Sequence, residues 1–299
     1  MFTVAALYHF TRFSDPDGLR PPLVDLCERE GIRGTLLVAK EGINGTVAGS
    51  RAGIDALLAH LRSLPGCADL EHKESTATEM PFNRMKVRLK REIVTMGQPD
   101  VDPLAGTGHY VKPADWNALI QAGDVAVIDT RNDYEVAIGT FEGAIDPKTK
   151  SFGEFPAWWQ ENKHRFHNKR VAMFCTGGIR CEKSTNYLLG QGVEEVYHLQ
   201  GGILKYLEEV PEEDSTWNGE CFVFDGRVSV GHALKEGDLK LCYACRRPLQ
   251  PEDLRRDEYE LGVSCHQCLH ETSAGDRERF RERQKQIKLA TKRGEKHIG

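Results

Sequence analysis

The sequence predicts a protein of the α/β class with three parts: a small ferredoxin-like α+β domain, a central doubly wound domain and a cysteine-rich C-terminal extension. Three observations predict this. Strands and amphipathic helices alternate over residues 1–96, nearly unbroken apolar strands alternate with helices over residues 122–216, and the composition changes at about residue 217. Alternating elements of this kind pack in layers, and a continuous apolar run is typical of a buried parallel strand.

The first domain, 1–96, shows the order β-α-β-α-β with room for one more strand. We expect these elements: strands at 4–8, 34–38, 45–48 and 85–94, and helices at 19–30 and 51–63. The second helix repeats Ile54, Leu57 and Leu61 on one face, as a helix that covers a sheet does. The order fits a ferredoxin-like, acylphosphatase-like sandwich. Between two strands, Asn44-Gly45 is expected to form a hairpin turn, in preference to a nucleotide-binding loop.

The remaining chain divides into a linker, a central domain and an extension, with the bounds 97–121, 122–216 and 217–299. Glycines and prolines interrupt regular structure in the linker before a short helix begins. Beyond it we expect these elements: helices at 113–120 and from 276 to about 293, strands at 125–129, 171–174 and 196–199, and a β-rich piece at 221–230.

The composition limits the classes of function. A net charge of -5 and a pI of about 6.1 exclude a generally basic protein, so nucleic acid would have to bind to a local patch. No secretory signal is evident, and no apolar run approaches the roughly 20 residues that span a bilayer. We therefore expect a cytoplasmic protein that does not enter the membrane. Nine cysteines in a reducing compartment indicate metal binding and catalysis rather than disulfides.

The loop Cys175-Thr176-Gly177-Gly178-Ile179-Arg180 carries the strongest chemical signal. It follows a predicted buried strand and leads into a helix. Gly177 and Gly178 let backbone N–H groups point inward, and the positive end of the helix adds to them, so Cys175 should lose its proton readily. Arg180 adds a permanent positive charge for an anionic donor or product. A catalytic nucleophile is favoured over a buried structural cysteine.

The size of the loop points to sulfur chemistry. Arg180 stands five places after Cys175, which gives Cys-x4-Arg, whereas cysteine phosphatases enclose a phosphate with Cys-x5-Arg. The smaller ring suits a sulfur atom, so we expect Cys175 to carry a persulfide. Cys181 lies one residue beyond the ring. Two interpretations of it stay open: a resolving cysteine that forms a transient disulfide with Cys175, and an inert helix cysteine.

Two Cys-x-x-Cys pairs, separated by nineteen residues, predict a structural zinc site. The expected ligands are Cys242, Cys245, Cys265 and Cys268. Four thiolates complete a tetrahedral site and leave no open position, so the metal should organise the fold and not catalyse. His266 and His270 are not needed for it.

Two basic segments are candidates for RNA contacts. The first surrounds the last strand of the first domain, and the second is the C-terminal helix; the residues proposed, together with the polar Asn44, are Arg84, Lys86, Arg88, Lys90 and Arg293. In the strand, Lys86, Arg88 and Lys90 share one face, which leaves Val87 and Leu89 for the core. A solvated surface explains both segments about as well as phosphate binding does.

The central domain resembles rhodanese domains. The resemblance rests on residues 126–131 and 133–135, on Gly139 and 143–145, and on the closing segment 197–203. It implies that Asp129 and Arg131 support the Cys175 loop by hydrogen bonding. A plain ion pair at the end of the strand and a direct contact with substrate are the alternatives.

Nearly the whole chain resembles the bacterial rhodanese-related tRNA uridine hydroxylases. Residues 39–46, the basic strand, 109–111, the loop 174–183, both Cys-x-x-Cys pairs and the tail 293–299 carry this resemblance. It implies 5-hydroxylation of the wobble uridine of tRNA, dependent on Cys175, with molecular oxygen as co-substrate and a persulfide donor protein as a partner. No dinucleotide-binding fingerprint is present, so no nucleotide cofactor is expected. A small-molecule sulfurtransferase and a non-enzymatic, zinc-stabilised RNA-binding protein are the competing hypotheses.

Overall fold

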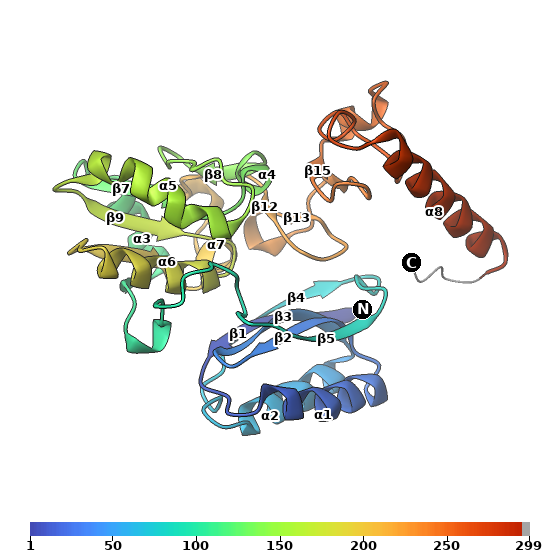
Figure 1. The fold of residues 1–299 in the computed structure, drawn as a ribbon, viewed down its shortest axis with the longest axis horizontal. Coiled ribbons are helices and arrows are strands. Elements are labelled where there is room, and N and C mark those ends of the chain that lie inside the picture. The colour runs from blue at the N-terminus through green and yellow to red at the C-terminus, as the bar shows by residue number, and fades with distance from the viewer. Residues whose placement is uncertain (295–299) are drawn as a thin grey trace. The chain divides into compact units, whose positions relative to one another are not determined.

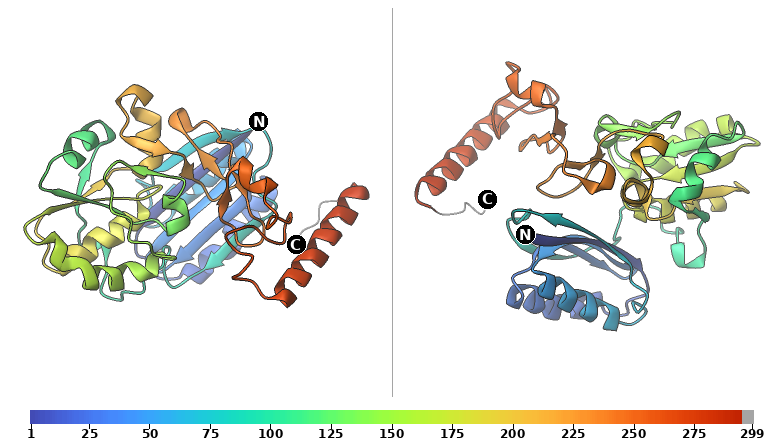
Figure 2. Two further views of the ribbon diagram at one scale, coloured as in Figure 1. Left: turned by 90° about the horizontal axis from the view of Figure 1, so that it is seen from above. Right: turned by 180° about the vertical axis from the view of Figure 1, so that it is seen from behind.

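The computed structural model describes residues 1–294 and divides into two compact units, Met1–Lys235 and the part that begins at Glu236. Figures 1 and 2 show the first unit as two layered domains: a sheet with two helices on one face, and a second sheet enclosed by helices. The mixed α/β class predicted from the sequence is confirmed.

The first domain is a five-stranded sheet covered by α1 and α2 on one face (Figure 1). Its elements are β1 (Phe2–Phe10), α1 (Pro16–Arg29), β2 (Arg33–Ala39), β3 (Gly42–Gly49), α2 (Arg51–Ser63), β4 (His72–Ala77) and β5 (Met85–Leu89). The strand order is β4-β1-β3-β2-β5, and only β2 and β5 run parallel. The first four strands have the ferredoxin-like order, which the sequence predicted. Leu23 of α1 and Leu57 of α2 pack on Leu36 of the sheet.

The hairpin between β2 and β3 differs from the prediction. Lys40 and Glu41 form its turn, whereas Asn44 and Gly45 lie inside β3. Asn44 donates from Nδ2 to the carbonyl of Ile93 (2.8 Å), and Glu41 Oε1 accepts from the N–H of Ile93 (2.6 Å). The predicted Asn-Gly turn is therefore wrong, because these side chains hold the segment that follows β5.

The last strand of this domain is shorter than predicted, because β5 ends at Leu89 and not at residue 94. The chain turns there, and Glu92 accepts hydrogen bonds from the backbone N–H groups that follow it. Val87 is buried as expected, but Leu89 is exposed, contrary to the prediction that it faces the core. Lys90 follows the strand and does not share its face.

The second domain is a four-stranded parallel sheet with helices on both faces (Figure 2). Its elements are β6 (His109–Val111), α3 (Pro113–Ile120), β7 (Val125–Asp129), α4 (Asp133–Val136), β8 (Gly139–Phe141), α5 (Phe155–Asn162), β9 (Arg170–Phe174), α6 (Ile179–Gly190), β10 (Val196–Leu199) and α7 (Gly202–Glu209). The sheet order is β6-β10-β9-β7. Trp159 of α5 packs with Met173 on one face, whereas Trp116 of α3 and Tyr206 of α7 pack with Phe174 on the other. The doubly wound arrangement is confirmed, although β6 and β8 were not predicted.

The chain after α7 returns to the second domain. There β11 (Trp217–Gly219) pairs with β8, and β12 (Cys221–Phe222) pairs with β13 (Ser229–Val230). Trp217 and Val230 belong to the same apolar cluster as Phe141. Residues 217–235 therefore pack with the second domain, and the division between the two units falls after Lys235.

The second unit contains β14 (Lys240–Leu241), β15 (Pro248–Leu249) and α8 (Ala274–Lys292). Helix α8 begins two residues before the predicted start, because Ser273 caps it by accepting from the N–H of Asp276 (3.1 Å). No helix among residues 1–294 is long and apolar enough to cross a bilayer. The stretch 295–299, which takes part in the family resemblance, lies outside the described residues.

Candidate active site

Cys175 stands where β9 ends and the turn into α6 begins. Its Sγ accepts a hydrogen bond from the backbone N–H of Gly178 (3.1 Å). Gly178 has a φ of 104°, a conformation that favours glycine and permits the tight turn. The carbonyls of Cys175 and Thr176 accept from the N–H groups of Ile203 and Leu204 at the start of α7 (3.0 and 3.1 Å). The loop is thus fixed by β9, α6 and α7 together.

The thiol of Cys175 is buried and yet acidic. Burial by itself raises its pKa, but the hydrogen bond with the Cys181 side chain, the charge of Arg180 and the N–H groups of Cys181 and Gly178 outweigh burial and lower the pKa to about 6. The thiolate therefore predominates at neutral pH. A deprotonated sulfur is the form that acts as a nucleophile.

Cys181 occupies the first turn of α6 and has the opposite environment. Burial, the hydrogen bond with Cys175 and the negative charge of that thiolate raise the pKa of Cys181 well above the ordinary value of a thiol. Its Sγ also lies 3.7 Å from Thr130 Oγ1. The structure thus brings the two cysteines together, with one acidic and one held protonated.

Arg180 is part of a buried ion pair. Its Nη1 and Nη2 donate to the two carboxylate oxygens of Glu135, both at 2.8 Å. Thr176 Oγ1 donates to the same carboxylate (3.2 Å). Burial raises the pKa of Glu135, but Arg180 outweighs this effect, so the pKa is lowered and the carboxylate stays charged. Arg180 therefore braces the loop through α4 and also acidifies Cys175.

Asp129 and Arg131 form a second buried ion pair, at the end of β7. Arg131 donates from Nε and Nη2 to the two oxygens of Asp129 (2.9 and 2.6 Å). It also donates to the carbonyls of Glu135 and Gly139 (3.2 and 2.6 Å). These bonds tie β7 to the segment before β8 and do not touch the Cys175 loop. The geometry is that of an ion pair at the end of a strand, which is one of the alternatives that the sequence left open.

Glu182 lies beside the cysteines and links the two domains of the first unit. Tyr8 of β1 donates to Oε1 (3.1 Å), and Tyr110 of β6 donates to Oε2 (2.7 Å). Burial raises the pKa of Glu182 despite these two bonds. A Cβ on Gly178 would lie 2.8 Å from the Tyr8 hydroxyl, so the first domain reaches the cysteine loop itself.

Lys183, the next residue, forms the other link between these domains. Its ammonium group lies between Glu41 Oε2 (2.9 Å) and Glu92 Oε2 (2.6 Å), both from the first domain. The lysine is only 1% exposed. The start of α6 therefore carries the end of the Cys175 loop and also anchors the domain that faces it.

A cavity of about 1140 Å³ opens beside the loop. Cys175 and Gly177 form part of its wall, and the face of the first sheet that α1 and α2 leave uncovered forms another, through residues such as Thr35 and Asn44. A Cβ added to Gly177 would meet nothing within 4 Å, so the space in front of the loop is open. Ligand pockets for drug-sized molecules measure roughly 300–1000 Å³. The cavity therefore has room for a ligand much larger than a small sulfur compound.

Sequence reasoning missed four residues of this site: Tyr8, Thr130, Glu135 and Glu182. Glu135 and Glu182 each stand in the first turn of a helix beside the predicted loop, and that position was a usable signal because both helices begin at the site. Tyr8 gave no signal, since it is 174 positions from its partner Glu182.

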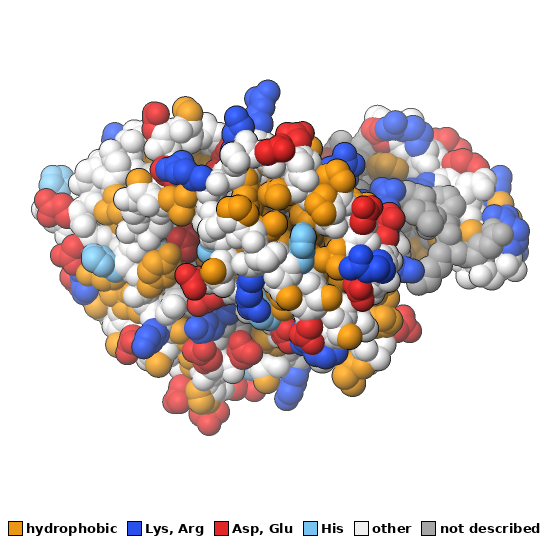
Figure 3. All heavy atoms as spheres, turned by 90° about the horizontal axis from the view of Figure 1, so that it is seen from below, with side chains coloured by type: hydrophobic (Ala, Val, Ile, Leu, Met, Phe, Trp, Pro, Cys, Tyr) orange, Lys and Arg blue, Asp and Glu red, His pale blue; other side chains and the backbone are white. Residues whose placement is uncertain are grey.

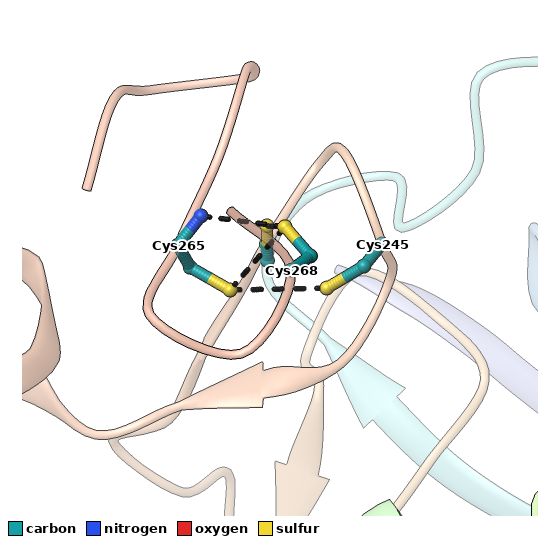
Figure 4. Close-up of side chains that lie close together, drawn as sticks. Cys245, Cys265 and Cys268 are labelled. Atoms are coloured by element: carbon teal, nitrogen blue, oxygen red, sulfur yellow. Dashed lines mark hydrogen bonds between the residues drawn. The ribbon is translucent and has the colours of Figure 1, made fainter. Parts of the chain in front are cut away.

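The four predicted metal ligands lie together in the second unit. Their Sγ atoms are all within 4.8 Å of one another, and Figure 4 shows three of them converging. The Cys242–Cys268, Cys245–Cys265 and Cys265–Cys268 sulfur separations are 4.0, 3.8 and 3.7 Å. A tetrahedral zinc ion with Zn–S bonds of about 2.3 Å needs sulfurs about 3.8 Å apart. The cluster could therefore hold a metal, and the residues fit zinc.

The predicted RNA contacts are dispersed. Asn44 lines the cavity, Lys86 and Arg88 belong to the edge strand β5, and Arg293 is the C-cap of α8. Arg84 and Lys90, which flank β5, are exposed. Figure 3 shows basic and acidic side chains interspersed on the face in view.

Several basic residues of α8 stabilise their own unit. Arg277 donates to the carbonyl of Leu269 (2.9 Å), and Arg283 donates to the carbonyl of Gly262 (2.9 Å). Arg281 pairs with Glu260 (2.7 Å). Part of the positive charge that the sequence places on this helix is therefore used within the unit.

The fold and the loop define a protein in which a rhodanese-like domain faces an acylphosphatase-like domain. Family models agree: residues 2–93 match the UPF0176 acylphosphatase like domain, and residues 112–209 match the rhodanese-like domain. Curated relatives extend this over the whole chain. The chain is 74% identical to the tRNA uridine(34) hydroxylase of Ruegeria pomeroyi, with 100% of this chain and 99% of the relative covered.

Two further relatives have the same name. The protein of Roseobacter denitrificans is 71% identical (98% of this chain, 99% of the relative), and that of a Jannaschia species is 67% identical (100% and 99%). The chain belongs to the tRNA uridine(34) hydroxylase family, and the resemblance found in the sequence is confirmed.

Proposed function

We propose that this protein hydroxylates uridine 34 of tRNA at the cavity beside Cys175. The names of its relatives supply the reaction and the substrate. The small-molecule sulfurtransferase, the alternative that the loop alone allowed, is not favoured by this family. The proposal places the protein in the cytoplasm, where tRNA is found.

One observation of the structure carries the proposal: an acidic cysteine stands at the wall of a cavity that two domains build together. A sulfurtransferase for small acceptors needs the loop, but it does not need the sheet of another domain facing it. Here the uncovered sheet face and the loop enclose about 1140 Å³. Enzymes that modify a base in RNA take the base out of its stack into such a pocket. The cavity therefore fits a nucleotide of a loop better than a free thiol.

The finer chemistry belongs to the same proposal. The Cys175 side chain is 0% exposed although it lines the cavity. A persulfide would carry its outer sulfur one bond further into the open space before Gly177, and a persulfide donor protein would supply that sulfur. Molecular oxygen is proposed as the source of the hydroxyl oxygen. Cys181 is proposed to resolve that persulfide: its sulfur attacks the Cys175 sulfur, a Cys175–Cys181 disulfide forms, and hydrosulfide leaves.

The Cys242, Cys245, Cys265 and Cys268 cluster is proposed to bind zinc. Its four sulfurs fill a tetrahedral shell, so the metal would stabilise the second unit and would take no part in the reaction. Basic residues beside β5 and on α8 are proposed to contact the tRNA outside the cavity, where their charges add affinity without reading sequence.

Nucleoside mass spectrometry of tRNA tests the proposal. A strain that lacks the gene should lose 5-hydroxyuridine, and the wild-type gene should restore it. The Cys175→Ser variant should not restore it, with a loss of at least roughly a thousandfold, because the nucleophile is gone. Cys67→Ala is a matched control, since Cys67 is a buried cysteine in the core of the first domain. Full restoration by Cys175→Ser would refute the catalytic role.

A further inference from the structure

Lys73 of β4 is a basic residue of the cavity that neither the sequence motifs nor the mechanism has used. It lines the same cavity as Cys175. Among residues 1–294, no ion pair or hydrogen bond of its ammonium group is found. Arg180 and Lys183 differ from it, because each is paired with carboxylates. Lys73 is thus a cation at the cavity wall with no carboxylate within ion-pair distance among the described residues, although Glu208, Glu209 and Glu71 lie near enough to raise its pKa.

The position of Lys73 relates it directly to the cysteine loop. A Cβ on Gly201 would lie 2.8 Å from Lys73 Nζ, so the ammonium group rests against Gly201. The next residue, Gly202, begins α7, and a Cβ there would lie 2.5 Å from the carbonyl oxygen of Cys175. Only the backbone of Gly201 and Gly202 therefore lies between the Lys73 ammonium group and the carbonyl of Cys175.

Charges of both signs surround this ammonium group: Lys205 on one side, and Glu208, Glu209 and Glu71 beyond ion-pair distance. Lys205 lies on the same side of Gly201 as the Lys73 ammonium group. Lys205 has a distant partner, Glu209, at 3.7 Å. Leaving a half-buried ammonium group without a carboxylate at ion-pair distance is unfavourable, and an oxyanion that enters the cavity would remove that cost.

We propose that Lys73 binds a backbone phosphate of the tRNA while the adjoining base occupies the cavity beside Cys175. This rests on the proposed function and adds a residue to it. A phosphate beside the target nucleotide must enter the cavity with the base, because the two are covalently joined. Lysine acts on phosphate as a point charge and does not read the base. Lys73 would therefore fix the depth and register of the nucleotide, and the loop would act on its base.

The ionisation of Lys73 gives the proposal a pH signature. Burial, together with nearby Lys205, outweighs Glu208, Glu209 and Glu71 and lowers the pKa of Lys73 to about 8. The ammonium form therefore falls as pH rises through about 8. A phosphate contact made by this group weakens over the same range, and an arginine at the position would keep its charge.

The test measures the affinity of the full-length protein for an unmodified tRNA as a function of salt and pH. Lys73→Gln should weaken binding roughly fivefold at low salt and reduce the slope of log K against log salt by about 0.7–0.9, the effect of one phosphate contact. Lys73→Arg should restore both values and remove the loss of affinity above pH 8. Lys169→Gln is the control, since Lys169 is an exposed lysine outside the cavity lining.

Equal affinity and equal salt slope for Lys73→Gln and Lys169→Gln would overturn the proposal. So would unchanged tRNA binding in Lys73→Gln together with weaker thiosulfate binding, because the site would then serve a small anion. Hydroxyuridine formation by the wild-type protein is measured on the same tRNA. Its absence would reject the proposed function, whereas the salt slopes judge Lys73 independently.

Discussion

The protein has two clusters of cysteines, and their surroundings make the same side chain serve different ends. Cys175 and Cys181 lie at a strand-to-helix turn, with the backbone N–H of Gly178 on one sulfur and an open cavity in front. In the second unit, four sulfurs face one another within 4.8 Å. The first cluster leaves a sulfur available to a ligand. The second brings four sulfurs close enough together to hold a metal ion.

The two clusters differ in which groups stabilise the negative charge of a thiolate. At Cys175 the stabilising charge comes from the protein, through Arg180, whose own charge is balanced by Glu135. At the four-cysteine cluster no lysine or arginine is among the groups that most affect the pKa of Cys242 or Cys265. Four thiolates without cations repel one another, and a divalent cation removes that repulsion. The charge of Cys175 is thus balanced within the protein, whereas the four-cysteine cluster could hold a metal ion that balances its charge.

The largest expected effect separates the two clusters. Removing the metal with a chelator, or the Cys265→Ala substitution, should unfold the second unit, since structural zinc contributes on the order of 10 kcal/mol to such small units. Hydrogen exchange should rise throughout residues 240–292 and stay unchanged in β7 and β9. Cys221→Ala, a buried cysteine of the first unit, is the control. If the second unit stays protected after chelation, its fold does not depend on a metal.

A smaller effect is expected from the charged support of Cys175. Glu135→Gln should destabilise the first unit by about 3–5 kcal/mol, because Arg180 would remain buried and charged without its partner. Urea denaturation measures this. The matched control is Asp124→Asn at the exposed pair with Arg170, which should leave the midpoint unchanged. Equal midpoints for both variants would show that the loop does not depend on the buried pair.

The smallest effect concerns the ionisation of Cys175. Its pKa is lowered to about 6, so thiolate absorbance and hydroxylation should hold from pH 8 to 7 and fall as pH falls through 6. The stability that the depressed pKa contributes is fully present above the unfolded thiol pKa of about 9 and is lost progressively as pH falls from about 9 to about 6. Cys181→Ala removes a hydrogen bond to the thiolate and should move the fall towards higher pH. An unshifted titration would show that Cys181 does not act on Cys175.

The sequence predicted much of the fold because its signals are local. The helix at 51–63 and the strands at 125–129 and 196–199 appear at the expected positions, since each carries its own periodicity or apolar run. The Asn44-Gly45 turn failed because long-range bonds to Ile93 decide the conformation there. The predicted burial of Leu89 was wrong because β5 is at the edge of the sheet, where nothing covers this side chain.

The candidate site divides in the same way. Cys175, Gly178 and Arg180 belong to one short loop, so spacing was enough to select them. Their partners come from elsewhere: Glu135 from α4 and Glu182 with Tyr8 from across the domain boundary. Spacing says nothing about such pairs. The loop could therefore be predicted, whereas the groups that tune and enclose it could not.

The Lys183 ammonium group, held between Glu41 and Glu92, limits how a substrate can arrive. If the first domain rotated away from the second, Lys183, which is only 1% exposed, would lose both of its carboxylate partners. Breaking a buried arrangement of this kind costs about 3–5 kcal/mol, which makes an open form rarer than about one molecule in a hundred. The two domains should therefore keep their arrangement while a substrate enters the cavity between them.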